Sequence, residues 1–133
     1  MGKSARSVYN ASRILTDSIS SAVELRRAQS GTYFFVSASA ATTITLPEPA
    51  DGNYFRFIVR DGMTQEITVQ SQEGLSMYGP LVTEQGGTGV TITENSNGSV
   101  VLGAGAAAGS YLDVMYSNDA WYISGIASGS AWS

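Results

Sequence analysis

Acidic side chains are the main candidates for chemistry in this chain of 133 residues, because it contains no histidine and no cysteine. The commonest general base and metal ligand are therefore absent, as are disulfides and thiolate nucleophiles. Four glutamates stand singly among expected strands and turns: Glu66, Glu73, Glu84 and Glu94. They lack the alternating Asp and Asn spacing of a calcium loop, and nothing singles out two of them as a glycosidase pair. The sequence predicts a protein that is not an enzyme and binds no metal or cofactor. A glycan-cleaving carboxylate pair is the enzymatic alternative.

Two other patterns, a glycine-rich stretch and the aromatic residues, could indicate ligand binding. Gly86 to Gly89 (GGTG) resembles a phosphate loop, but no Gly-Lys-Ser/Thr and no helix follow it, so we interpret it as a turn. Most aromatic residues fall at core spacing inside expected strands, where burial is the default. Tyr78 lies in a long connection and Trp132 lies one residue from the end of the sequence, so we predict these two as interface anchors.

Charge is divided unequally along the chain. Five basic residues against two acidic ones leave residues 1–27 at +3, whereas residues 61–133 hold seven acidic residues and no basic one. An acidic body repels nucleic acid and anionic membranes, so we expect neither as a partner of the body. No stretch reaches the roughly 18 apolar residues of a membrane-spanning helix. The basic start is interrupted by Arg13 and Asp17, which is not the pattern of a secretory signal.

The basic segment also carries a helix-like pattern. Within residues 7–28, a stripe recurs at alternating spacings of three and four: Val8, Ala11, Leu15, Ser18, Ala22 and Leu25. Residues 1–30 are therefore predicted as an N-terminal arm, helical or extended. The helix could pack on its own body, join a bundle with symmetry mates, or become ordered on docking to a partner. We favour the last two, because an isolated helix of this length is marginal in water.

Residues 31–133 are predicted as one body, an antiparallel β-sandwich or barrel of about eight strands. Four short strands are expected between Gly31 and Gln70, separated by turn residues. In one of them, residues 54–59, aromatic and β-branched side chains occupy both faces, which indicates a strand covered from both sides. A short strand is expected at 81–83, and Asn97-Gly98 predicts a hairpin between strands at 90–93 and 99–102. A second hairpin is expected between 111–116 and 121–126.

The order of these motifs resembles small β modules of tailed-bacteriophage virions. The resemblance runs from residue 31 to about 127, and it is carried by Thr-Ile-Thr-Leu-Pro at 43–47, Tyr-Phe-Arg-Phe-Ile-Val at 54–59, Glu-Ile-Thr-Val-Gln at 66–70 and Ala-Trp-Tyr-Ile-Ser-Gly at 120–125. It is strongest to capsid decoration proteins, also called cement or head-fibre proteins, and extends to terminal domains of tail fibres. It implies core strands and no catalytic residue.

The resemblance implies a virion structural protein on the capsid surface, made in the host cytoplasm. Its expected partners are the major capsid protein and further copies of itself, as a homotrimer. The arm is predicted to touch the shell and to bridge neighbouring capsid subunits. The predicted contact residues are Arg6, Tyr9, Arg13, Leu15, Arg26 and Arg27. The alternative is a fibre tip that binds host surface glycan, with Tyr78, Trp121 and Trp132 as stacking groups.

Overall fold

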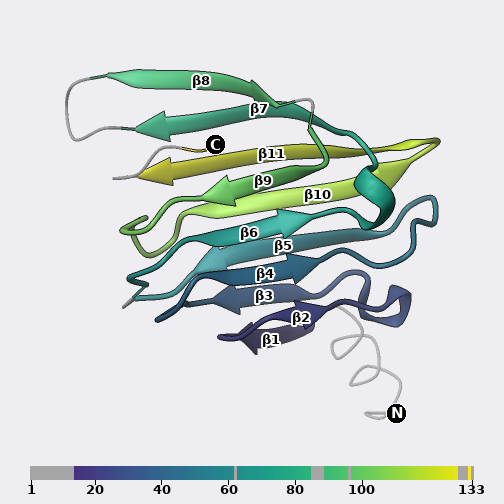
Figure 1. The fold of residues 1–133 in the computed structure, drawn as a ribbon, viewed down its shortest axis with the longest axis horizontal. Helices are drawn as coiled ribbons and strands as arrows, with labels where there is room; N and C mark the ends of the chain where they lie inside the picture. Colours follow the sequence, from purple (N-terminus) through teal and green to yellow (C-terminus); the bar gives the residue numbers. More distant parts are fainter. Residues whose placement is uncertain (1–13, 62, 85–88, 96, 129–131, 133) are drawn as a thin grey trace, which may run out of the picture.

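The computed structural model describes residues 14–61, 63–84, 89–95, 97–128 and 132, and it folds them into two β-sheets packed face to face (Figure 1). The seven-stranded sheet, called sheet A here, has the order β1-β3-β5-β10-β11-β7-β8. The four-stranded sheet, sheet B, has the order β2-β4-β6-β9. The prediction of a mainly β body is confirmed.

Eleven strands and two short 3₁₀ helices make up the described part. The strands of sheet A are β1 (Thr16–Ile19), β3 (Tyr33–Val36), β5 (Tyr54–Val59), β7 (Met77–Glu84), β8 (Val90–Asn95), β10 (Tyr111–Ser117) and β11 (Ala120–Ser128). The strands of sheet B are β2 (Val23–Glu24), β4 (Thr42–Thr45), β6 (Ile67–Gln70) and β9 (Ser99–Leu102). The 3₁₀ helices are η1 (Arg27–Gln29) and η2 (Gln72–Gly74).

The first six strands form a parallel coil. The chain alternates between the sheets, so that β1, β3 and β5 lie parallel in sheet A while β2, β4 and β6 lie parallel in sheet B. Each turn of this coil, one strand in each sheet, therefore stacks on the previous turn, as in a solenoid. The second half adds antiparallel pairs, β10 beside β5 and β9 beside β6.

The expectation of a wholly antiparallel arrangement is therefore wrong, and the sheets are mixed. The turn residues at 47–52 carry the chain from β4 in sheet B to β5 in sheet A. Parallel neighbours need a crossover connection, and the intervening strand of the opposite sheet supplies it. The hairpin expected at Asn97-Gly98 is wrong for the same reason, because β8 and β9 belong to different sheets.

The closing hairpin is confirmed. β10 and β11 pair with Val114 opposite Ile123 and Tyr116 opposite Trp121. Asn118 in the turn adopts φ 60°, a left-handed conformation that asparagine tolerates. Because a hairpin of this kind is specified by adjacent residues, the local sequence was sufficient to predict it.

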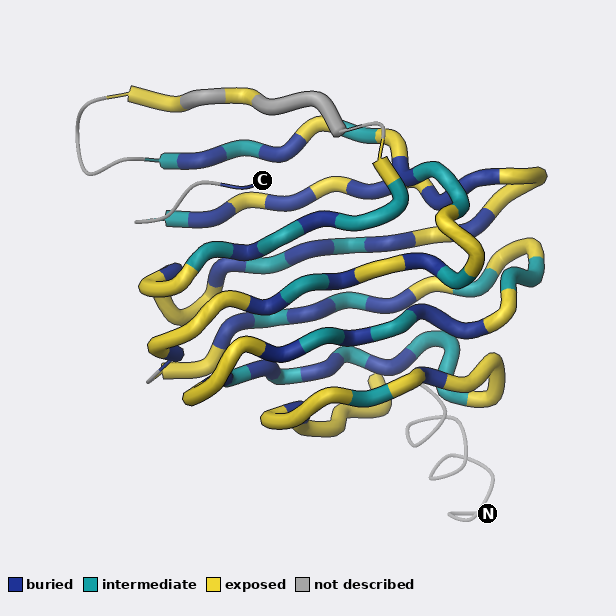
Figure 2. Tube along the Cα trace, viewed as in Figure 1, coloured by how far each residue is buried: buried dark blue, intermediate teal, exposed yellow. Residues whose placement is uncertain are grey.

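Alternation along the strands creates the core between the sheets (Figure 2). Phe34, Phe55 and Phe57 point inward from sheet A with ring centroids about 6 Å apart, and Trp121 lies beside Phe55. Sheet B contributes Ile44 and other aliphatic residues to the same buried cluster. Only one face of each sheet takes part in this core.

The N-terminal arm was predicted as helical or extended, and where the chain is described the helical alternative is wrong. Residues 16–19 form β1 and 23–24 form β2, which extend sheets A and B in parallel at their edges. Ile19 and Leu25 are buried in the common core. The many Ser and Thr residues compete for backbone hydrogen bonds in a helix, whereas the sheet edges supply partners for an extended chain. Residues 1–13 lie outside the described part.

Candidate functional site

Of the four glutamates singled out from the sequence, Glu66, Glu73 and Glu84 have described side chains, and Glu94 lies outside them. No three acidic residues in the described chain lie close enough together to hold a metal ion. Glu66 and Glu73 are exposed, and Glu84 accepts a hydrogen bond from Ser128 at 3.0 Å. Most of the Gly86-to-Gly89 stretch lies outside the described residues. The candidate site is therefore a surface rather than a cluster of titratable groups.

The outer face of sheet A, which points away from sheet B, is the most distinctive surface of the described chain. A first line of side chains crosses four neighbouring strands, and we call it the tyrosine row: Tyr54, Met115, Tyr122 and Tyr78. Their exposed fractions are 43, 51, 50 and 45%, although each is a large apolar or aromatic residue. The rings of Tyr78 and Tyr122 are 6.2 Å apart.

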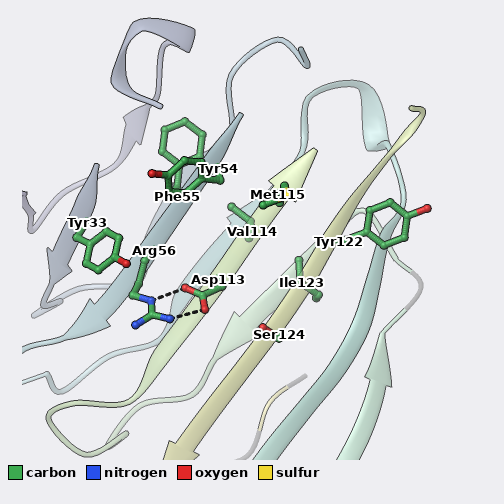
Figure 3. Close-up of a pocket in the computed structure, with 10 residues that line it drawn as sticks. All are labelled: Tyr33, Tyr54, Phe55, Arg56, Asp113, Val114, Met115, Tyr122, Ile123 and Ser124. Atoms are coloured by element: carbon green, nitrogen blue, oxygen red, sulfur yellow. Dashed lines mark hydrogen bonds and ion pairs between the residues drawn. The ribbon is translucent and has the colours of Figure 1, made fainter. Parts of the chain in front are cut away.

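An ion pair occupies the next line, the ion-pair row of Tyr33, Arg56, Asp113 and Ser124. The Arg56 guanidinium donates two hydrogen bonds to the Asp113 carboxylate, from Nε at 2.5 Å and from Nη2 at 2.7 Å (Figure 3). It also lies over the rings of Tyr33 and Tyr111, at 5.2 and 4.7 Å from their centroids. The hydrogen bond to Asp113 raises the pKa of Arg56 above its ordinary value. Arg56 is therefore fixed in place and stays charged.

A third line, the isoleucine row, is again apolar. It consists of Phe35, Ile58, Tyr111, Ile126, Val82 and Ile92, which follow one another across six strands. Ile126 and Ile92 are the most exposed of these, at 45 and 65%. The outer face thus has two apolar rows with one closed ion pair between them.

A shallow pocket of about 340 Å³ lies in this face. It is lined by side chains of the tyrosine and ion-pair rows, including Tyr33, Tyr54 and Tyr122 (Figure 3). Pockets with apolar walls and a few polar groups are typical of ligand and partner binding. The Asp113 carboxylate in this lining is already bonded to Arg56.

The outer face of sheet B is different in character. Its outward positions are mostly short and polar: Glu24, Thr43, Thr45, Thr68, Gln70, Ser99 and Val101. Threonine is well suited to a solvated strand face. The two sheet faces therefore differ strongly in polarity, and among the described residues only the sheet A side exposes large apolar residues over several strands.

The residues predicted from the sequence fall in several places. Arg6, Tyr9 and Arg13 lie outside the described residues. Leu15 is 68% exposed immediately before β1, at the edge of sheet A, whereas Arg26 is exposed after β2 of sheet B.

Arg27 is held by its own chain. It donates hydrogen bonds to the carbonyls of Glu48 and Pro49, and its guanidinium lies 3.4 Å from the Glu48 carboxylate. Both members of this ion pair are largely exposed. The contact fixes the direction in which Arg27 points, towards the loop that precedes β5.

The two predicted anchors lie on opposite sides of sheet A. Tyr78 belongs to the tyrosine row on the outer face. Trp132 is buried against the inner side of this sheet, where its indole Nε1 donates a hydrogen bond to the Val82 carbonyl at 2.9 Å. The same residue forms an isolated antiparallel β-bridge with Leu102. A Cβ on Gly125 would come within 2.9 Å of the Trp132 ring. Trp132 therefore anchors the end of this chain rather than an interface, and the completely buried Trp121 is likewise no stacking group.

Sequence reasoning missed most of the outer face. The available signal was that residues 54–59 carry aromatic and β-branched side chains on both faces of the strand, which predicted that other parts of the protein pack on both faces. In the structure Phe55 and Phe57 are covered by sheet B, whereas Tyr54 on the other face is exposed. The expectation that this strand is covered from both sides is therefore wrong within the described chain, which covers only the face of Phe55 and Phe57.

These observations define a class, a two-sheet β protein with a parallel coil at one end and an apolar outer sheet face. No protein-family model matches the chain, and neither the curated proteins nor the solved structures compared with it give a match. Among the described residues, no helix is long and apolar enough to cross a membrane.

Proposed function

We propose that the protein is a non-enzymatic structural component of a tailed-phage virion, which binds the outside of the capsid and stabilises it by bridging neighbouring subunits. The observation that carries the proposal is the outer face of sheet A, a broad apolar surface on which the one ion pair of the described residues is already closed. It supports a role in assembly, whereas the capsid contact itself is assigned to the N-terminal segment. Such a surface is suited to assembly, because large exposed apolar patches mark interaction sites. The choice of capsid as partner rests on the resemblance of residues 31–127 to virion decoration modules.

The N-terminal segment is the proposed capsid contact. It carries Arg6, Tyr9 and Arg13, and it joins the body beside exposed Leu15 at the edge of sheet A. Arg26 adds a further exposed positive charge near this end. Arg27 would contribute after releasing Glu48. The acidic remainder of the body would face solvent, since residues 61–133 hold no basic residue.

Stabilisation would follow from selective binding. A protein that binds assembled shell but not loose subunits shifts the assembly equilibrium towards the shell. Several arms on one oligomer would also raise the effective concentration of each arm at its site. No covalent chemistry is needed for this mechanism.

Co-sedimentation with capsids of the phage that carries this protein tests the proposal. The wild-type chain is expected to pellet with shells, and a chain lacking residues 1–13 to remain in the supernatant. The combined variant Arg6→Glu and Arg13→Glu should also lose binding, whereas Arg60→Glu, which reverses an exposed charge after β5, should retain it. A wild-type chain that stays in the supernatant would contradict capsid binding, and full binding by the shortened chain would contradict the role of the arm.

The tyrosine row favours a second candidate, a fibre tip that binds host glycan. Tyr54, Tyr122 and Tyr78 expose their rings along one line, and aromatic faces stack on apolar faces of ligands. Binding of host surface polysaccharide, lost in Tyr122→Ala and unaffected by removal of residues 1–13, would support this candidate over capsid decoration.

A further inference from the structure

We infer that the outer face of sheet A packs against the same face of a second copy of this chain, as a two-fold symmetric pair. The inference does not depend on the capsid, because it rests on this face alone. A second copy would cover the outer side of β5, where Tyr54 is exposed. The inferred pair also differs from the homotrimer that the resemblance implies.

The extent of the apolar face is the first argument. The four residues of the tyrosine row and Ile126 are each about half exposed. Side chains of this size present about 150–250 Å² each, so these five leave roughly 500 Å² of largely apolar surface. Ile92 and the half-buried members of the isoleucine row extend it towards the roughly 800 Å² per partner of a standard interface. A patch of about 500 Å² is already at the upper end of what a typical monomer exposes, and patches of this size are often functional.

The second argument is that the charges in the ion-pair row of this face are already paired with each other. Arg56 and Asp113 satisfy each other with two hydrogen bonds, and each side chain is only 34% exposed. Covering the face would therefore leave neither charge without a partner, which is the costly outcome when ions are buried. A partner recognised by its charge would need an uncompensated charge in the ion-pair row, and its two charged residues bond to each other. The closed pair instead fits a partner whose own face is neutral and apolar.

The order of the rows gives the third argument, which concerns self-complementarity. The ion-pair row lies between two apolar rows, so its position is central along the strands. A two-fold axis in the plane between two stacked faces brings the central row over its own copy. The tyrosine row of one copy then meets either the tyrosine row or the isoleucine row of the other copy, and both of these contacts are apolar. The face is thus complementary to itself, as an isologous interface requires.

A saccharide is the other occupant to consider. Its many hydroxyl groups need hydrogen-bonding partners, because polar groups buried without them are destabilising. In the ion-pair row, Arg56 and Asp113 already bond to each other, and the row otherwise offers only the hydroxyl groups of Tyr33 and Ser124. The row supplies few free polar groups for a sugar, so the observations favour a second copy of the chain.

Light scattering on the purified full-length protein, over a range of concentrations, tests the inference. We expect twice the 13.9 kDa chain mass at high concentration, decreasing towards the chain mass on dilution. Met115→Lys and Tyr122→Lys should each weaken the pair about thirtyfold or more, because a charge placed in an apolar interface centre has no partner. Gln70→Lys, at an exposed strand position on sheet B, is the matched control and should leave the mass unchanged.

Circular dichroism of each variant confirms that the strands are retained, since both substituted residues are half exposed. A monomer at all concentrations, a trimer, or a dimer that is equally stable in Met115→Lys would overturn the inference. A monomer that binds oligosaccharide through Tyr122 would replace it with the glycan interpretation. Failure to bind capsids would leave this result unaffected, so the two proposals fail separately.

Discussion

At the scale of single residues, the ion pair between Arg56 and Asp113 has a small but measurable role in stability. Asp113→Asn removes the charge that Arg56 faces, and because both side chains are one-third exposed we expect a loss of about 1 kcal/mol or less. The pKa of Arg56 is raised, so its contribution is fully present below the ordinary arginine pKa and disappears only as pH rises through the higher folded value. Urea unfolding should show no effect of Arg56 titration between about pH 6 and 10. Glu48→Gln, in the more exposed pair with Arg27, is the control, and a loss as large as that of Asp113→Asn would contradict this ranking.

Trp132 has a larger role at the same scale. Its side chain is 5% exposed and packs over Gly125 in the core, so Trp132→Ala should lower the free energy of unfolding by about 3–5 kcal/mol. Trp132→Phe keeps most of the ring but loses the hydrogen bond to Val82, and it should be less destabilising. Denaturant unfolding measures both variants. Equal stability of wild type and Trp132→Ala would show that the indole is not in the core.

At the scale of elements, β7 depends on one glycine. Gly79 has φ 153°, and a Cβ at this position would lie 1.7 Å from the carbonyl oxygen of Ile123 in β11. Gly79→Ala must therefore displace one of two neighbouring strands in sheet A. We expect a loss above about 3 kcal/mol by thermal or denaturant unfolding, at the severe end of single substitutions. Gly52→Ala, where the space is open but φ is also positive, should be milder, and the reverse order would contradict the close approach.

The first two strands are part of the folded body, which changes how the arm can be tested. Deleting residues 1–13 should preserve the unfolding transition, because the described sheets begin after this segment. Deleting residues 1–28 removes β1 and β2 together with buried Ile19 and Leu25, so we expect severe destabilisation. Thermal unfolding of both shortened chains measures this difference. A stable chain lacking 1–28 would show that the parallel coil does not need its first turn.

The elements also show which features the sequence could predict. Local signals were sufficient for the strands between residues 31 and 70 and for the β10–β11 hairpin, since each depends on alternation and on adjacent turn residues. They were insufficient for assigning strands to sheets, because a turn residue reverses the chain equally well within one sheet or between two. The helical spacing of 7–28 was misleading because Leu25, a member of that stripe, is buried in the core from an extended chain. The exposed position of Tyr54 depends on which face sheet B covers, and this is a property of the tertiary fold.

At the scale of the whole molecule, the account rests on an asymmetry between two sheet faces. Sheet B presents threonines and other short polar residues, whereas sheet A presents tyrosines, Met115 and aliphatic residues. The charge of the chain is also divided, with the basic residues 1–27 at one end of an acidic body. Together these features predict two separate contacts, one between copies through sheet A and one with a capsid through the arm.

Oxidation of methionines by dilute peroxide tests most directly whether the outer face of sheet A is covered in solution. Met115 is 51% exposed in the single chain, whereas Met63 and Met77 are buried and serve as internal references. The account predicts that the oxidation rate of Met115, followed by mass spectrometry, falls towards that of Met63 as protein concentration rises, and that Tyr122→Lys restores the fast rate. A fast Met115 rate that is independent of concentration would contradict the account.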